Sequence, residues 1–140
     1  MPIHKMTLED GIFFSKQVGY IDNVDIRMWA NALTNYANSS DRPIMALVDL
    51  IEVERLCPSI LKVLGKVLLT ADLFGVVMVV SDQMASRNAS VLGKLSELDN
   101  VRIFDNLEEA QRFVKAQLNP TFGMYHKQAA SVMRMVAAAI

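Results

Sequence analysis

A thiol and a hydroxyl stand on either side of Pro58, where an apolar-striped helix is expected to begin. Cys57 and Ser59 follow the apolar run of residues 44–50 and a charged break at residues 52–55. The start of a helix carries free backbone N–H groups and the positive end of the helix dipole. That environment favours a thiolate on Cys57 and a phosphate on Ser59, so these residue types could support nucleophilic or phosphoryl chemistry.

Both residues also have a purely structural interpretation. Cys57 has no Cys-x-x-Cys partner, and Arg55 is the only base near it in the sequence, so a buried and unreactive thiol is the favoured interpretation. For Ser59, capping or solvation of the first helical turn is favoured over phosphorylation. The stretch therefore predicts a binding surface rather than a catalytic centre.

Other residue types that build active or metal sites lack the required spacing. His4 and His126 lie at opposite ends of the chain and Cys57 is the only cysteine, so no zinc site is predicted. Glu52 and Glu54 are interpreted as solvated charges, and no loop has the ligand spacing of a calcium site. No nucleophile with an adjacent base, pair of catalytic acids or cofactor loop is recognisable. We therefore expect no enzymatic activity, no metal and no cofactor.

Length, composition and net charge limit the classes of protein to which this chain can belong. The 140 residues suit a single core domain, and 52% are hydrophobic, which is enough for a substantial core. The formal net charge of −1 provides no long-range field for nucleic acid or an anionic membrane. No apolar stretch is long enough for stable membrane insertion. With a single cysteine and no recognisable signal peptide, a cytoplasmic location is expected.

The first third of the chain predicts a hairpin and a helix. Residues 3–8 and 11–20 have strand character and are joined through Asp10 and Gly11, a pair that favours a tight turn. Asp22 is then expected to cap a helix. The apolar residues of that helix recur at helical spacing: Ile26, Trp29, Ala30, Leu33, Tyr36 and Ala37.

Two apolar runs predict the centre of the sheet. Residues 44–48 and 76–80 show no polar alternation, as expected of parallel strands covered on both faces. Pro58 suits the first turn of the helix that connects them. A shorter helix is expected at about 85–98 and a strand at 101–104. The predicted fold class is thus α/β, a mixed sheet with helices packed against it.

The end of the domain is predicted by a second capping pattern. Asn106 and Glu109 have the spacing of a capping box before an apolar-striped helix, which closes the domain near residue 118. The complete order is β-β-α-β-α-β-α-β-α, with one antiparallel entry strand and four helices.

The stretch from Asp49 to Ser59 resembles the STAS domain of sulphate transporters and anti-sigma-factor antagonists, the SpoIIAA-like superfamily. The similarity rests on Val48, Asp49 and Leu50 at the strand end, Val53 three residues later, and a hydroxyl at the helix entrance. It extends over roughly residues 3–118 through the element order. The resemblance implies a non-enzymatic domain that binds a protein partner, such as a kinase or an anti-sigma-like regulator.

In anti-sigma-factor antagonists the helix opens with Asp-Ser-Ser-Gly or Asp-Ser-Thr-Gly, and a partner kinase phosphorylates a hydroxyl there. Counted from Asp49, this chain has Cys57 at the aspartate of that motif and Pro58 at the phospho-acceptor. Ser59 falls at the next hydroxyl and Ile60 at the glycine. The resemblance therefore leaves Ser59, one residue out of register, as the candidate phospho-acceptor.

The last part of the chain is expected to be separate from the domain of residues 1–118. Residues 119–123 are interpreted as a linker and residues 124–140 as an amphipathic helix. An isolated helix of this length is marginal, so it should pack on its own domain, on a second copy to form a homodimer, or on a membrane surface.

The sequence is compatible with two functions. The first is a STAS-like regulatory module that recognises a protein partner through the loop 51–59 and the start of the following helix. The alternative is a carrier of a small apolar ligand or lipid, suggested by nine methionines and many aliphatic residues. The predicted partner-binding residues of the first function are Glu52, Glu54, Arg55, Ser59 and Lys62.

Overall fold

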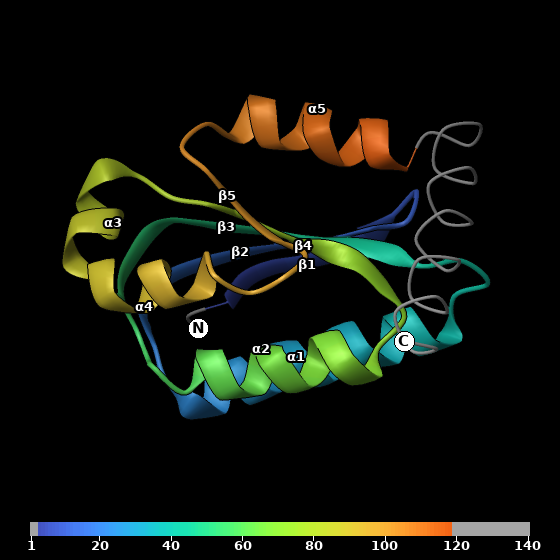
Figure 1. The fold of residues 1–140 in the computed structure, drawn as a ribbon, viewed down its shortest axis with the longest axis horizontal. Coiled ribbons are helices and arrows are strands. Elements are labelled where there is room, and N and C mark those ends of the chain that lie inside the picture. Colours follow the sequence, from blue (N-terminus) through green and yellow to red (C-terminus); the bar gives the residue numbers. More distant parts are fainter. Residues whose placement is uncertain (1–2, 119–140) are drawn as a thin grey trace, which may run out of the picture.

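A five-stranded mixed sheet in the order β1-β2-β3-β4-β5 forms the centre of the protein, in a computed structural model that describes residues 3–118 (Figure 1). The first two strands are antiparallel, and every other neighbouring pair is parallel. The predicted α/β class and the mixed sheet with one antiparallel entry strand are confirmed. The elements are β1 (Ile3–Glu9), β2 (Ile12–Ile21), α1 (Asn23–Ser39), β3 (Ile44–Leu56), α2 (Ile60–Thr70), β4 (Leu73–Val79), α3 (Asp82–Arg87), α4 (Ala89–Leu95), β5 (Val101–Phe104) and α5 (Leu107–Gln117).

The predicted hairpin between β1 and β2 is confirmed. Glu9 pairs with Ile12, so the loop consists of Asp10 and Gly11 alone. Both have positive φ values, 52° and 79°, as a tight two-residue hairpin turn requires. This turn fixes which residues of β2 face each side of the sheet.

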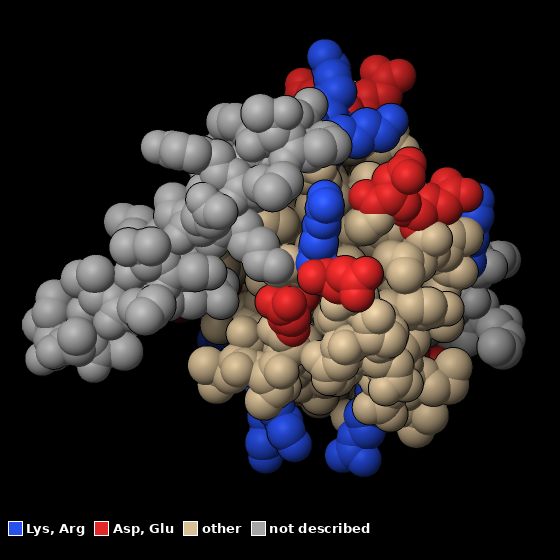
Figure 2. Space-filling view, turned by 90° about the vertical axis from the view of Figure 1, so that its right-hand side faces the viewer, with Lys and Arg blue, Asp and Glu red and all other residues tan. Residues whose placement is uncertain are grey.

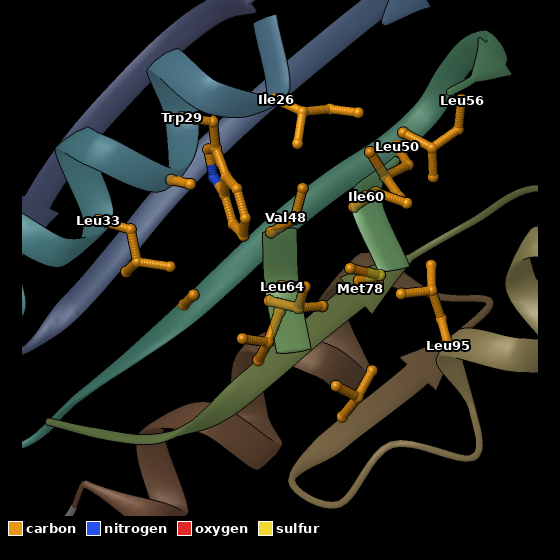
Figure 3. Close-up of a cluster of buried hydrophobic side chains, with 14 of the residues drawn as sticks. Ile26, Trp29, Leu33, Val48, Leu50, Leu56, Ile60, Leu64, Met78 and Leu95 are labelled. Atoms are coloured by element: carbon orange, nitrogen blue, oxygen red, sulfur yellow. The ribbon is translucent and has the colours of Figure 1, made fainter. Parts of the chain in front are cut away.

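Helices α1 and α2 cover one face of the sheet, and α5 covers the other (Figure 1). On the first face, Trp29 and Leu33 of α1 and Leu64 of α2 point into a shared interior with Val48 and Leu50 of β3 (Figure 3). The indole Nε1 of Trp29 donates to the Ser15 hydroxyl at 3.1 Å, so the polar atoms in this interior are paired. This cluster is the larger part of the core.

The second face has a smaller core beneath α5. Met45 and Leu47 of β3 and Val77 of β4 pack there with Ala110 and Val114 of α5. Successive residues of β3 thus alternate between two apolar layers, which explains why its sequence shows no polar alternation.

Two predicted segments have different boundaries in the structure. The charged stretch 51–56, predicted as a loop, continues β3, because β2 pairs with it as far as Ile21 and Leu56. The helix predicted at 85–98 is divided into α3 and α4 at Asn88, whose φ of −121° leaves the helical range. In addition, α2 begins at Ile60 rather than at Pro58.

The cap of α1 gives the protein a titratable contact. The Asp22 carboxylate accepts the Asp25 N–H at 2.9 Å, and the Asp25 carboxylate accepts the Asp22 N–H at 3.0 Å, a reciprocal capping box. The hydrogen bond from Asp25 lowers the pKa of Asp22 below its ordinary value of 3.8. The contribution of this cap to stability is therefore complete above pH 3.8 and is lost as the pH falls through the lowered pKa.

Replacing Asp22 with Asn should keep the cap and remove its titration, since both residues accept the same N–H. We expect the melting temperature of the wild type, measured relative to Asp22→Asn, to fall as the pH drops below 3.8. Thermal unfolding followed by circular dichroism at several pH values tests this. Parallel curves for the two proteins over that range would contradict it.

The predicted linker 119–123, the amphipathic helix 124–140 and the boundary after residue 118 lie outside the described residues. Within residues 3–118, none of the helices combines the length and apolar character needed to cross a bilayer.

Candidate functional site

The carboxyl end of β3 extends beyond its neighbour β4. The pairing of β3 with β4 ends at Asp49 and Val79, whereas its pairing with β2 continues to Leu56. One edge of residues 51–56 therefore has no strand beside it. In Figure 1 this extension lies at the left end of the molecule, close to α3 and α4.

Asn88, at the junction of α3 and α4, takes the place of the missing strand. Its Oδ1 accepts the Leu56 N–H at 2.8 Å, and its Nδ2 donates to the Glu54 carbonyl at 3.2 Å. The same Nδ2 donates to the Met84 carbonyl in α3 at 3.0 Å. Asn88 is only 5% exposed, so its bonds to the Leu56 N–H and the Met84 carbonyl are buried, and its bond to the Glu54 carbonyl is partly buried. Asn88 thus fixes the end of β3 to α3.

Ser81 makes a second connection of the same kind. Its hydroxyl donates to the Ile51 carbonyl at 3.2 Å and accepts the Met84 N–H at 3.1 Å, which caps α3. A residue that begins a helix therefore also satisfies an edge carbonyl of β3. Together Ser81 and Asn88 make the β3 extension a rigid part of the sheet.

Charged side chains gather on the α5 side of this extension. Asp49 is 5% exposed, and its Oδ1 accepts the Ile51 N–H at 3.0 Å. Lys16 of β2 forms an ion pair with Glu52, with 2.8 Å between Nζ and Oε2, and this hydrogen bond raises the pKa of Lys16. The pair is 42% and 55% exposed, so it contributes little to stability and leaves its charges accessible.

The turn between β3 and α2 already uses much of the helix start. The Ile60 N–H donates to the Cys57 carbonyl and the Leu61 N–H to the Pro58 carbonyl, each at 3.1 Å. The Ser59 hydroxyl donates to the Cys57 sulfur at 3.2 Å and makes no capping bond. Two of the N–H groups that would receive a phosphate are therefore occupied.

A groove of about 810 Å³ runs between α1 and α2 on the outer surface. Ser59 and Lys62 line one wall, and Arg27 and Asn31 of α1 line the other. The start of α2 thus faces this groove.

Comparison with solved structures identifies the fold. An anti-sigma factor antagonist from Mycobacterium paratuberculosis has a TM-score of 0.59 and 21% identity, over 79% of this chain and 92% of that one. An uncharacterised protein of the DUF3478 family with a SpoIIAA-like fold, from Shewanella loihica PV-4, has a TM-score of 0.53 and 17% identity, over 80% of this chain and 90% of that one. The protein has a SpoIIAA-like fold. No family model and no curated protein matches the sequence.

The SpoIIAA-like fold distributes the predicted partner-binding residues over three places. Glu52 lies on the α5 side of the sheet, paired with Lys16. Glu54 and Arg55 are exposed at the end of β3. Ser59 and Lys62 line the groove on the opposite side. The structure therefore brings Ser59 and Lys62 together and separates them from Glu52 by the sheet.

Two features of the site were missed by sequence reasoning. Asn88 was predicted to lie within a continuous helix. The one sequence signal for a buried role is that this polar residue has apolar residues at helical spacing on both sides. Arg27 and Lys66 of the groove wall were not singled out, because their proximity depends on how α1 packs on α2.

A pocket of about 300 Å³ bears on the carrier hypothesis. It lies between α5 and the start of β4, with Phe74 and Phe113 among its apolar residues and Asn100 and Arg102 among its polar ones. This volume is at the lower end of ligand pockets, roughly 300–1,000 Å³, and suits a small molecule better than a lipid. Over residues 3–118, no group of three or more His, Cys, Asp or Glu is arranged to hold a metal ion.

Proposed function

We propose that this protein is a non-enzymatic regulatory module of the STAS type, which binds a protein partner through the end of β3 and the start of α2. The observation that carries the proposal is the fixed presentation of two opposite charges. Glu54 and Arg55 are exposed, while the backbone beside them is held by the buried side chain of Asn88. A rigid surface loses little conformational freedom when a partner binds.

The fold supports the same proposal. One structural neighbour is an anti-sigma factor antagonist, a protein that acts on another protein. The site also lies at the carboxyl end of parallel strands, where binding sites in such sheets commonly occur. We place the protein in the cytoplasm, in line with its single cysteine.

Two further predictions concern phosphorylation and self-association. Phosphorylation of Ser59 stays a prediction, and the occupied N–H groups of Ile60 and Leu61 weaken the physical argument for it. A kinase partner depends on that prediction. The homodimer was predicted through residues 124–140, outside the described part of the chain.

Reversing both charges should abolish partner capture without unfolding the domain. The variant Glu54→Lys/Arg55→Glu keeps the net charge and changes only exposed side chains. We expect proteins enriched on the tagged wild type from an extract of the source cells to fall by about tenfold or more, because a few residues, often including an arginine, carry most of the binding energy in many interfaces. Quantitative mass spectrometry of the captured proteins provides the measurement.

A matched variant on α5 controls for general charge effects. Glu108→Lys/Arg112→Glu also exchanges two exposed charges of opposite sign, on the far face of the sheet. It should capture the same proteins as the wild type. If the β3 variant remains folded by circular dichroism and captures as much as this control, the proposed function is wrong.

A further inference from the structure

The groove between α1 and α2 is lined by cations and neutral polar groups. On α1, Asn23, Arg27, Asn31 and Thr34 recur along one face, and α2 contributes Ser59, Lys62, Lys66 and Thr70. Its lining contains no carboxylate. Figure 2 shows Lys and Arg side chains projecting from the lower side of the molecule, where α1 and α2 lie in Figure 1, with no acidic side chain beside them.

The two lysines that line the groove repel each other. Lys62 and Lys66 are four residues apart on α2, so their like charges are neighbours on one helix face. Arg27 adds a third cation from the facing helix. The carboxylates of Asp22 and Asp25, at the start of α1, accept backbone N–H bonds in the capping box and do not line the groove. The charged residues that line the groove are therefore all cations.

The floor of the groove is apolar. Ala30 of α1 and Val67 of α2 are each 5% exposed, and Val63 and Cys57, which also line the groove, are half-buried. The eleven residues of α2 give the groove a length of about 16 Å. An occupant that matches both charge and floor has carboxylates along its edges and apolar side chains between them.

The C-terminal segment of this chain has the wrong charge for that role. Residues 119–140 contain Lys127 and Arg134 and no Asp or Glu. Nucleic acid fits less well, because duplex DNA carries one charge per roughly 1.7 Å whereas the groove offers three cations over an apolar floor. The net charge of −1 adds no attraction for a polyanion.

We propose that the α1–α2 groove binds an acidic, amphipathic segment of a partner protein. This inference rests on the proposed function, since it names the chemistry of the partner whose binding site includes Ser59 and Lys62. It adds Arg27 and Lys66 as recognition residues. The acidic segment approaches along the groove, with its carboxylates on these cations and its apolar side chains over Ala30 and Val67.

A defined peptide tests the groove without knowledge of the partner. The probe is a fluorescent twelve-residue helical peptide with glutamates on one face and leucines on the other, and its counterpart carries lysines in place of glutamates. We expect the acidic peptide to bind the wild type at least tenfold more tightly than the basic one in fluorescence anisotropy. Raising the salt concentration should weaken that binding, since exposed charges are screened.

Charge reversal at two positions locates the site. Arg27→Glu/Lys66→Glu should weaken binding of the acidic peptide tenfold or more. Arg112→Glu/Lys115→Glu makes the same change on α5, at exposed positions of the opposite face, and should alter binding less than twofold. Both variants should give the wild-type circular dichroism spectrum.

Several outcomes would overturn the inference. One is an equal loss of peptide binding in the groove and α5 variants. Another is tighter binding of a single-stranded oligonucleotide than of the acidic peptide. A third is a dimer, seen by native mass spectrometry, in which a second copy occupies the groove and prevents peptide binding. The Glu54→Lys/Arg55→Glu variant distinguishes the two proposals. If it abolishes capture while Arg27→Glu/Lys66→Glu leaves peptide binding unchanged, the proposed function stands and the acidic segment is wrong.

Discussion

Replacement of Asn88 by alanine is expected to lower the free energy of unfolding by about 2–4 kcal/mol, because it leaves the buried Leu56 N–H without a partner and removes two further hydrogen bonds. The Leu56 N–H and the Glu54 carbonyl both bond to this side chain, and no neighbouring strand can replace it, since β4 ends its pairing at Val79. The Met84 carbonyl also loses its bond from the Asn88 side chain. Chemical denaturation followed by circular dichroism measures the loss.

Asn35→Ala is the matched control for this experiment. Asn35 lies on the exposed side of α1, where alanine has the higher helix propensity. Its stability should stay within about 0.5 kcal/mol of the wild type. If Asn88→Ala proves equally mild, the bonds from Asn88 do not hold the end of β3, and the rigidity used in the proposed function loses its basis.

The second large effect is expected at Gly75 in β4. A Cβ atom at this position would lie 2.7 Å from the Asn100 carbonyl oxygen, closer than van der Waals contact allows. That oxygen also accepts the Val76 N–H at 2.8 Å, so it cannot move without loss of a backbone bond. Gly75→Ala should therefore destabilise the protein by about 1–3 kcal/mol, the usual range for overpacking, in denaturant unfolding.

Gly65 provides an internal control of opposite sign. It lies in α2, and nothing lies within 4 Å of the Cβ that alanine would add. Gly65→Ala should stabilise the protein by up to about 1 kcal/mol, because glycine is a poor helix former. Destabilisation by both substitutions, or by neither, would contradict the geometry described for β4 and α2.

Local sequence signals account well for the elements that depend on neighbouring residues. Asp10 and Gly11 form the expected turn, and Asp22 caps α1 as predicted, because these bonds join residues close in sequence. The apolar runs likewise identified β3 and β4 as central strands. The α/β class and the order of the strands along the chain followed from these signals.

The errors arose where a distant residue determines the local structure. Glu52, Glu54 and Arg55 have the composition of a loop, yet β2 and Asn88 hold them in a strand. The division of the predicted helix at Asn88 has the same cause, since that side chain bonds to β3. The groove residues Arg27 and Lys66 come together only through helix packing, which no local pattern contains.

The sheet order has a consequence for how the chain assembles. Strands β1 to β5 lie side by side in the order in which they occur along the chain. No strand has to insert between two that are already paired, and each new strand adds to an open edge left by the one before. The hairpin of β1 and β2 is the most local of these pairings, so it offers the lowest entropic cost for a first contact. The N-terminal half of this protein can therefore pair its strands during synthesis while the C-terminal half is still being made.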